Sequence, residues 1–143
     1  MGDSFAYITN LLNANGVSLC LIHSNSGNFG TCTTRNPANL PATSLGFIAI
    51  NPAGTVAYVG NNQLNSTTIS LCPINSDGTL AACSTSDGNG TFSTPYAIAF
   101  NNAGSIAYVT NFNNANVSVC PVNANGSFGT CSTTGNGFNG PLG

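Results

Sequence analysis

The chain repeats itself about every fifty residues. The tripeptide Ala-Tyr-(Ile/Val) starts at Ala6, Ala57 and Ala107, and an Asn follows each copy after one further residue. Downstream of each copy lies an alternating segment that ends in cysteine, at Cys20, Cys72 and Cys120. Self-similarity at a fixed period is the signature of an array of like supersecondary units. The 143 residues therefore predict three copies of one unit within a single domain, 1–143.

Each full unit is expected to form four short β-strands, because β-branched and aromatic residues alternate with polar ones between turns rich in Gly, Asn, Pro and Ser. The first strand of a unit is predicted at 47–50 and 96–100, and the second at 5–9, 55–60 and 105–110. The third is predicted at 17–22, 68–74 and 117–122, and the fourth at 29–33, 79–84 and 127–132. One inner strand is missing from the first unit. The prediction is an all-β fold.

Four antiparallel strands in about fifty residues is the size of a β-propeller blade. The expected blade units span approximately 1–46, 47–95 and 96–143. Within a unit, the first two strands are joined by an Asn-x-Ala-Gly turn, at 51–54 and 101–104, where the Gly can adopt a positive φ without steric cost.

The repeat carries a family resemblance. The segment 95–111, PYAIAFNNAGSIAYVTN, followed by VSV at 117–119, resembles the YVTN-type β-propeller repeat, a relative of the lactonase-like seven-bladed propellers. This sequence departs from the pattern in its cysteines, in Asn or Ala where such repeats often carry Asp and Lys, and in blade number. The resemblance implies a lactone hydrolase only where acidic and basic residues line the centre of the propeller.

Six cysteines occur as three regularly spaced pairs, Cys20 with Cys32, Cys72 with Cys83 and Cys120 with Cys131. Asp77-Gly78 and Asn125-Gly126 lie midway between two of these pairs and are typical of two-residue type I′ turns, which would place the cysteines opposite one another. The third pair centres on Ser26, in a loop one residue longer. Disulfides across each hairpin are the favoured interpretation, and they imply an extracellular or cell-surface location.

Two other states of the cysteines stay open. Counting outward from a two-residue turn puts them at a hydrogen-bonded pair, the wider kind, and a type I turn with a G1 bulge would shift the register by one residue and leave the thiols free. Metal binding is disfavoured because zinc sites prefer cysteines two to four residues apart, whereas each pair here encloses ten or eleven residues.

Charged residues make up 3% of the sequence, with one Arg, three Asp and a net charge of −2. This composition offers no basic patch for nucleic acid and no long-range field for a charged partner. No apolar run approaches the 18 or more residues that span a bilayer. We therefore expect no nucleic-acid partner and no membrane span.

The sequence offers few residues for catalysis, a cofactor or a metal. His23 occupies the position of Asn75 and Asn123 in the other units, which favours a polar hairpin residue over a general base. Asp87 lies in Asp-Gly-Asn-Gly, which faintly resembles part of a calcium loop but lacks its other carboxylates. The only cation, Arg35, is typical of a solvated loop. The sequence thus predicts no catalytic residues, no cofactor and no metal.

Blade number leads to the functional hypothesis. A closed propeller needs roughly four to eight blades, so three units are too few to close. We therefore expect a non-enzymatic extracellular structural protein that associates with copies of itself, as a ring or a filament, through exposed blade edges. The edge residues predicted for this contact are Phe5, Tyr7, Pro141 and Leu142. The alternatives are a propeller module that binds a glycan or a protein, and an arc of a longer propeller.

Overall fold

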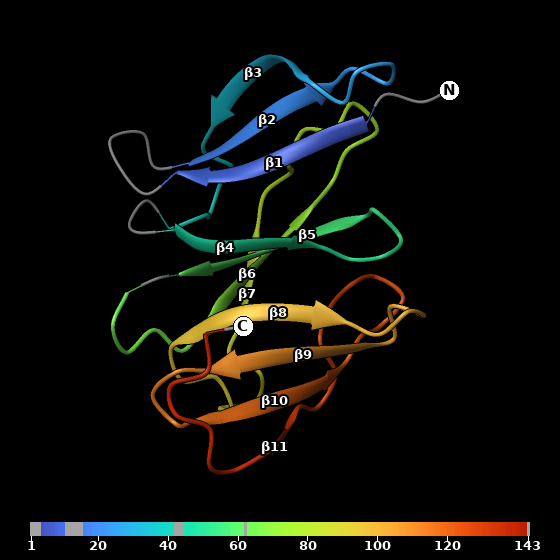
Figure 1. Ribbon diagram of the computed structural model, residues 1–143. Coiled ribbons are helices and arrows are strands. Elements are labelled where there is room, and N and C mark those ends of the chain that lie inside the picture. The colour runs from blue at the N-terminus through green and yellow to red at the C-terminus, as the bar shows by residue number, and fades with distance from the viewer. Residues whose placement is uncertain (1–3, 11–15, 42–44, 62, 143) are drawn as a thin grey trace.

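The computed structural model describes residues 4–10, 16–41, 45–61 and 63–142. These residues form three antiparallel sheets and no helix, and no described segment therefore provides a helix able to cross a membrane. The sheets lie one beside the next in chain order (Figure 1). The predicted all-β fold built from propeller-type blades is confirmed.

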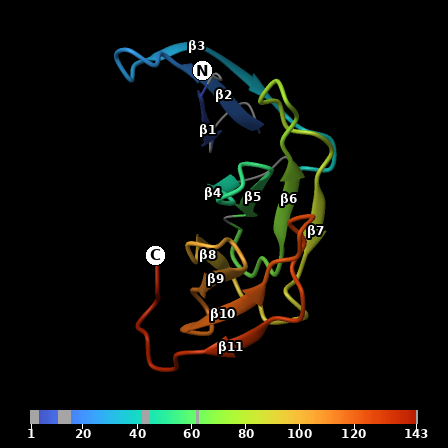
Figure 2. The same cartoon turned by 90° about the vertical axis from the view of Figure 1, so that its right-hand side faces the viewer.

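Each sheet is a meander in which consecutive strands pair. The first contains β1 (Ser4–Asn10), β2 (Gly16–Ile22) and β3 (Phe29–Arg35). The second contains β4 (Leu45–Ile50), β5 (Val56–Asn61), β6 (Ile69–Pro73) and β7 (Ser84–Ser86). The third contains β8 (Pro95–Phe100), β9 (Ile106–Asn111), β10 (Asn116–Pro121) and β11 (Ser132–Thr134). Strands β1, β4 and β8 lie along the same side of the molecule, which we call the inner side (Figure 2).

The fourth strands of the second and third sheets differ from the prediction. Strands were expected at 79–84 and 127–132, but β7 and β11 are short and begin only at Ser84 and Ser132. Before them, pairing is reduced to the isolated bridges Ile74–Leu80 and Val122–Phe128. The prolines that end β6 and β10 have no N–H to donate, which interrupts the ladder at this point. In the first sheet Leu21 stands in their place, and β3 is continuous.

The prediction of type I′ turns is wrong. In the second sheet the Gly78 N–H donates to the Asn75 carbonyl at 2.9 Å and the Asn75 N–H to the Thr79 carbonyl at 2.8 Å, while Gly78 alone has a positive φ, 82°. This is a type I turn followed by a G1 bulge, and Asn123 to Ser127 repeat it in the third sheet. The Asp77 side chain stabilises it, since its Oδ1 accepts from the Thr79 N–H at 2.9 Å.

All three disulfides are formed despite this turn, and no cysteine is free. The turn sets Ile74 opposite Leu80, but farther along Leu71 is opposite Ser84, so one extra residue on the outer strand restores the register between them. The same shift lies between Ile22 and Cys20 in the first sheet, where Cys20 directly faces Cys32. The bridged Cα atoms are 4.1 to 4.2 Å apart, which is close to the narrow type of cross-strand pair and not the wider type expected.

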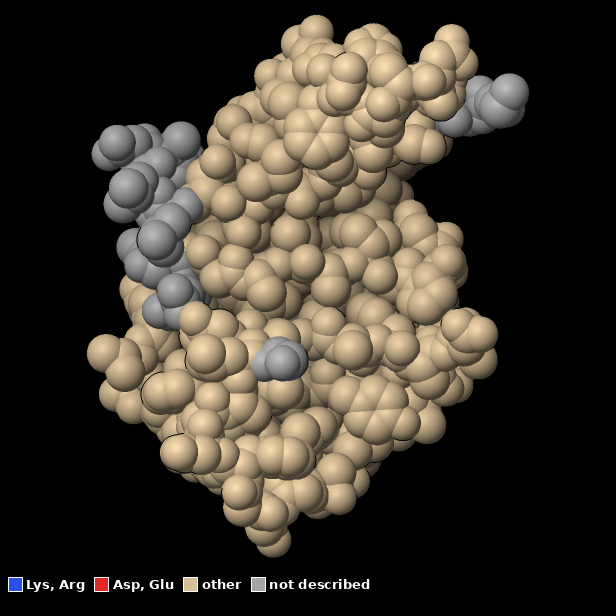
Figure 3. All heavy atoms as spheres, in the orientation of Figure 1, with Lys and Arg blue, Asp and Glu red and all other residues tan. Residues whose placement is uncertain are grey.

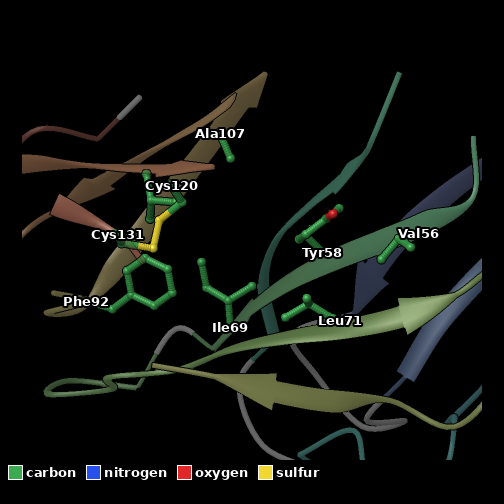
Figure 4. Close-up of a cluster of buried hydrophobic side chains, with 9 residues drawn as sticks. Val56, Tyr58, Ile69, Leu71, Phe92, Ala107, Cys120 and Cys131 are labelled. Atoms are coloured by element: carbon green, nitrogen blue, oxygen red, sulfur yellow. A yellow bond between two sulfur atoms is a disulfide. The ribbon is translucent and has the colours of Figure 1, made fainter. Parts of the chain in front are cut away.

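The core consists of side chains that fill the spaces between adjacent sheets. Between the second and third sheets a cluster is formed by Val56, Tyr58, Ile69, Leu71, Phe92, Ala107, Val109, Cys120 and Cys131 (Figure 4). Between the first and second sheets a smaller cluster contains Val17, Leu40, Leu45, Ala57, Val59, Cys72 and Cys83. Each sheet is therefore stabilised mainly by the apolar face of its neighbour.

A repeated tyrosine joins each sheet to the next. The hydroxyl of Tyr58 in β5 donates to the carbonyl of Gly126 at 2.5 Å, and that of Tyr7 in β1 donates to the carbonyl of Gly78 at 2.7 Å. Both glycines occupy the G1 position of the next sheet's turn. A Cβ on Gly126 would lie 2.4 Å from the Val56 side chain, so glycine is required for this close approach as well as for its φ.

The third copy, Tyr108 in β9, is 41% exposed, whereas Tyr58 is fully buried. The Tyr58 ring packs against those of Phe100 and Phe128, with centroid distances of 5.1 and 5.3 Å, and burial raises its pKa to about 12. Tyr108 occupies the same register position in the third sheet, on the face turned away from the second. No described residue forms a hydrogen bond with its hydroxyl.

These contacts predict a graded cost for removing each hydroxyl. Tyr58→Phe should lower the free energy of unfolding by about 1–3 kcal/mol because it leaves the buried Gly126 carbonyl without its donor. Tyr7→Phe should cost about 0.5–1 kcal/mol, because that site is half-buried. Tyr108→Phe is the matched control and should stay within about 0.5 kcal/mol of the parent. Urea denaturation measures all three, and equal losses for Tyr58→Phe and Tyr108→Phe would contradict the assignment.

The raised pKa of Tyr58 also predicts loss of stability in alkali. In the unfolded chain this tyrosine ionises near pH 10, whereas in the folded chain it resists ionisation up to about pH 12. Its contribution to stability is thus fully present below pH 10 and is lost as pH rises toward 12. Thermal melts between pH 8 and 11.5 should show Tm falling above pH 10, and less steeply in Tyr58→Phe. Identical slopes for parent and variant would contradict this.

Candidate functional site

The inner strands of the second and third sheets begin with an irregularity of the same kind. The register of β4 on β5 shifts between Leu45 and Ile48, and that of β8 on β9 shifts between Pro95 and Ala97. Extra residues of this kind redirect side chains and often occur beside active sites. Both shifts lie at the first residues of an inner strand, β4 or β8. The start of these strands is therefore a candidate site.

A pocket of about 300 Å³ lies between these two strand starts. It is lined by Gly46, Phe47, Pro95 and Tyr96. The Tyr96 ring is 39% exposed and lies 6.3 Å, centroid to centroid, from Phe112, which is 41% exposed. The pocket thus presents the aromatic rings of Phe47 and Tyr96, and such rings favour ligands that present C–H groups or a ring face.

Hydrogen bonds from neighbouring strands fix the backbone at and next to the pocket. The Thr9 hydroxyl of β1 donates to the Gly46 carbonyl at 2.7 Å, and the Thr110 hydroxyl of β9 accepts from the Ala97 N–H at 3.1 Å. The Phe47 ring lies over Gly60, where a Cβ would come within 2.2 Å of it. Glycine at 60 is therefore needed for the position of Phe47.

The Asn that follows each Ala-Tyr motif has a structural role where its side-chain contacts are described. Asn111 is fully buried, and its amide donates to Asn116 at 2.9 Å and Ser118 at 2.8 Å while its Oδ1 accepts from the Ser93 N–H at 3.0 Å. Asn10 donates to Ser18 at 3.0 Å in the same manner. These side chains join β1 to β2 and β9 to β10.

The titratable residues considered from the sequence lie apart from the aromatic pocket. Asp77 belongs to the turn after β6, and hydrogen bonds from Thr79 hold the pKa of its carboxyl below the usual range. Asp87 accepts from the Asn89 N–H at 3.0 Å within its own loop. His23 lies in the turn between β2 and β3, and Arg35 ends β3. Among the described residues, no group of His, Cys, Asp or Glu could hold a metal ion.

The residues predicted as an assembly edge lie at two places. Phe5 and Tyr7 are half-buried in β1 and contact the Gly78 turn of the second sheet. Pro141 is half-buried and Leu142 is 55% exposed in the segment after β11. A role for them in contacts between chains stays a prediction.

The inner side carries no charged side chain among the described residues (Figure 3). The view shows the face on which β1, β4 and β8 lie, as in Figure 1. Sequence reasoning looked for charged or hydrogen-bonding candidates and so passed over Phe47, Tyr96 and Phe112. These aromatic residues do not repeat at equivalent positions, since Gly46 stands where the third unit has Tyr96 and Phe47 where it has Ala97.

Comparison with solved structures shows that this arrangement recurs. A periplasmic gluconolactonase from Pseudomonas aeruginosa superposes with a TM-score of 0.73 at 19% identity, over 99% of this chain and 39% of that one. A Lactobacillus plantarum protein gives 0.74 at 15% identity, over 95% and 39%. A candidate 6-phosphogluconolactonase from Bacteroides uniformis gives 0.71 at 17% identity, over 96% and 38%. The chain therefore spans about two fifths of the length of these propellers. No curated protein matches it by sequence.

A family model gives the assignment that these structures alone do not. The model described as lactonase, 7-bladed β-propeller, matches residues 5–141. This match overturns the expectation of a non-enzymatic, self-assembling structural protein, and it does not favour a glycan- or protein-binding module. The expectation of a non-enzymatic protein was wrong because it treated the few charged residues of three blades as those of a complete active site. The three disulfides indicate an oxidising compartment. From residue 5 to residue 141, this chain belongs to the seven-bladed β-propeller lactonase family.

Proposed function

We propose that this chain forms three blades of a hydrolase that opens the ring of uncharged sugar lactones. The observation that carries the proposal is the family match over nearly the whole chain, together with an aromatic pocket at the starts of adjacent inner strands. The open face of the third sheet supports it. Ile106, Tyr108, Val117 and Val119 occupy the register positions of Val56, Tyr58, Ile69 and Leu71, which are buried by a following sheet. A further blade would cover this face in the same way.

The reaction adds water to an internal ester. Water attacks the lactone carbonyl carbon, the bond from that carbon to the ring oxygen breaks, the ring oxygen takes a proton to become a hydroxyl, and the products at neutral pH are a hydroxy carboxylate and a proton. The part we assign to the described residues is binding. The Phe47 and Tyr96 rings would stack against the C–H face of the sugar, and Phe112 would support Tyr96.

These three blades bring no fixed cation to the aromatic pocket, and their disulfides favour a substrate found outside the cytoplasm. A phosphate group is normally held by Arg, Lys or a cluster of backbone N–H groups. The sequence contains one Arg and no Lys, and Arg35 lies at the end of β3 between the first two sheets, away from the aromatic pocket. These blades thus supply no fixed cation to a phosphorylated sugar. With its three disulfides, the protein would work outside the cell, on lactones that have not been phosphorylated.

Substrate choice tests the proposed function. The complete propeller that contains these blades should hydrolyse glucono-1,5-lactone faster than the spontaneous reaction and at least about tenfold faster than 6-phosphogluconolactone, whose phosphate meets no cation at the aromatic pocket. Proton release at pH 6.5 measures both rates. Tyr96→Ala should raise KM, and Asp77→Asn, in an exposed turn away from the pocket, is the control. No acceleration of either lactone by the folded complete propeller would contradict the proposal, and a preference for the phosphorylated lactone would contradict the substrate class.

The position of Phe47 gives a second test of the pocket. Gly60→Ala would place a methyl group where the Phe47 ring lies, so it should move the ring and cost about 1–3 kcal/mol of stability from overpacking. The double variant Gly60→Ala, Phe47→Leu relieves the overlap. It should recover most of the stability of the parent, but its KM for the lactone should stay above that of the parent. Thermal melts and lactone kinetics measure the two effects. Unchanged KM in the folded double variant would show that Phe47 does not line the site.

A further inference from the structure

A second cavity lies away from the aromatic pocket, between the first and second sheets. Its volume is about 410 Å³, which falls in the usual range for small-ligand sites of roughly 300–1,000 Å³. Val17, Leu19, Pro37 and Leu80 form its apolar lining, and Arg35 and Asn36 also line it. Val17 is 3% exposed, so part of this lining belongs to the core.

The cavity exists because side chains fill the interface between the first and second sheets less completely than the interface between the second and third. Between the second and third sheets, Phe128 packs with its ring 5.3 Å from Tyr58 and 5.8 Å from Phe92. Leu80 occupies the same position in the second sheet, since the bridge Ile74–Leu80 corresponds to Val122–Phe128. Leucine is smaller than phenylalanine, and the space beside Tyr7 stays open.

The only cation of the sequence lines this same cavity. Arg35 faces Val17 across the ladder, at the position that Ser86 occupies opposite Ile69 and Thr134 opposite Val117. Among the described residues, nothing forms a hydrogen bond or ion pair with the Arg35 guanidinium or with the Asn36 side chain. Two departures from the repeat, a smaller apolar residue and an unpaired guanidinium, therefore coincide at one place.

Nearby charge comes from Asp77 alone among the described residues. Its carboxylate accepts from the Thr79 N–H at 2.9 Å and the Thr79 hydroxyl at 2.6 Å, so it is held within its turn and forms no ion pair with Arg35. Asp77 does not line the cavity. Its negative charge repels an anion near the rim, and, besides the hydrogen bonds from Thr79, the Arg35 guanidinium helps to lower the pKa of the Asp77 carboxyl without forming an ion pair with it.

We propose that this cavity binds a small organic monocarboxylate with a compact apolar body. The carboxylate would accept paired N–H donors from Arg35 and the amide of Asn36, while the apolar body would enter the space beside Leu19 and Leu80. A polyhydroxylated sugar fits this lining poorly, because its hydroxyls would lose water without gaining partners. The site is therefore distinct in place and in ligand chemistry from the aromatic pocket.

Benzoate is a suitable probe, and the chain supplies matched variants from its own repeats. Arg35→Ser copies Ser86, Leu80→Phe copies Phe128, and Asp77→Asn copies Asn125, whose Oδ1 accepts from the Ser127 N–H at 3.0 Å just as Asp77 does from Thr79. Each variant is therefore expected to fold. Circular dichroism and non-reducing mass spectrometry verify the fold and the three disulfides.

Methyl and Arg Nε signals in NMR titrations of the oxidised chain measure binding. Benzoate should shift the Leu19, Leu80 and Arg35 signals; Arg35→Ser should weaken binding about tenfold, the typical effect of losing a charge-assisted hydrogen-bonded pair. Leu80→Phe should abolish it, and Asp77→Asn should strengthen it a few-fold at low salt. Benzyl alcohol and acetate should bind more weakly than benzoate, because each lacks one half of the ligand.

Three results would overturn the proposal: no benzoate-dependent shift in the folded parent chain, equal affinity in the parent and Arg35→Ser, or full binding to Leu80→Phe. Lactone hydrolysis, measured with the same substitutions in the complete propeller, should be unchanged in all three variants because none lies at the aromatic pocket. Failure of this proposal would therefore leave the proposed function standing, and failure of hydrolysis would leave this site standing.

Discussion

The structure depends on the covering of each sheet's apolar face by the next sheet. A four-stranded meander buries too little surface alone, and the disulfides act within each sheet and not between sheets. The contact between sheets combines apolar packing with one directed hydrogen bond, from Tyr58 or Tyr7 to a G1 glycine carbonyl. Because that glycine is set by a type I turn with a bulge, the turn geometry determines how closely the sheets approach.

The same constraint explains which features followed from the sequence. The strands, the three sheets and the cysteine pairs repeat with the period of the unit, so spacing alone located them. The turn type did not follow, since Asp-Gly and Asn-Gly occur both in type I′ turns and in type I turns with a G1 bulge. The short β7 and β11 also did not follow, because Pro73 and Pro121 were counted as strand residues without weighing their missing N–H.

The candidate site was harder to predict than the fold for a related reason. Comparing the repeats identifies the residues that the units share. Phe47 and Tyr96 lie at positions where the units differ. Only the packing of β4 beside β8 brings the two rings to one pocket. The charge count also misled, because sparse charge in three blades does not exclude recognition of a neutral sugar by aromatic rings.

Both proposed sites lie at departures from the repeat, whereas the contacts that stabilise the fold lie where the units agree. Where the units agree, as at Tyr7 and Tyr58 or at the buried cysteines, the residues hold sheets together. Where the units differ, the structure has a pocket or an additional charge. One pocket lies at Gly46 and Tyr96, and a cavity lined by Leu80 and Arg35 lies between the first two sheets. A repeat array gains its core from identical contacts, so a site for a ligand must come from positions at which that identity is broken.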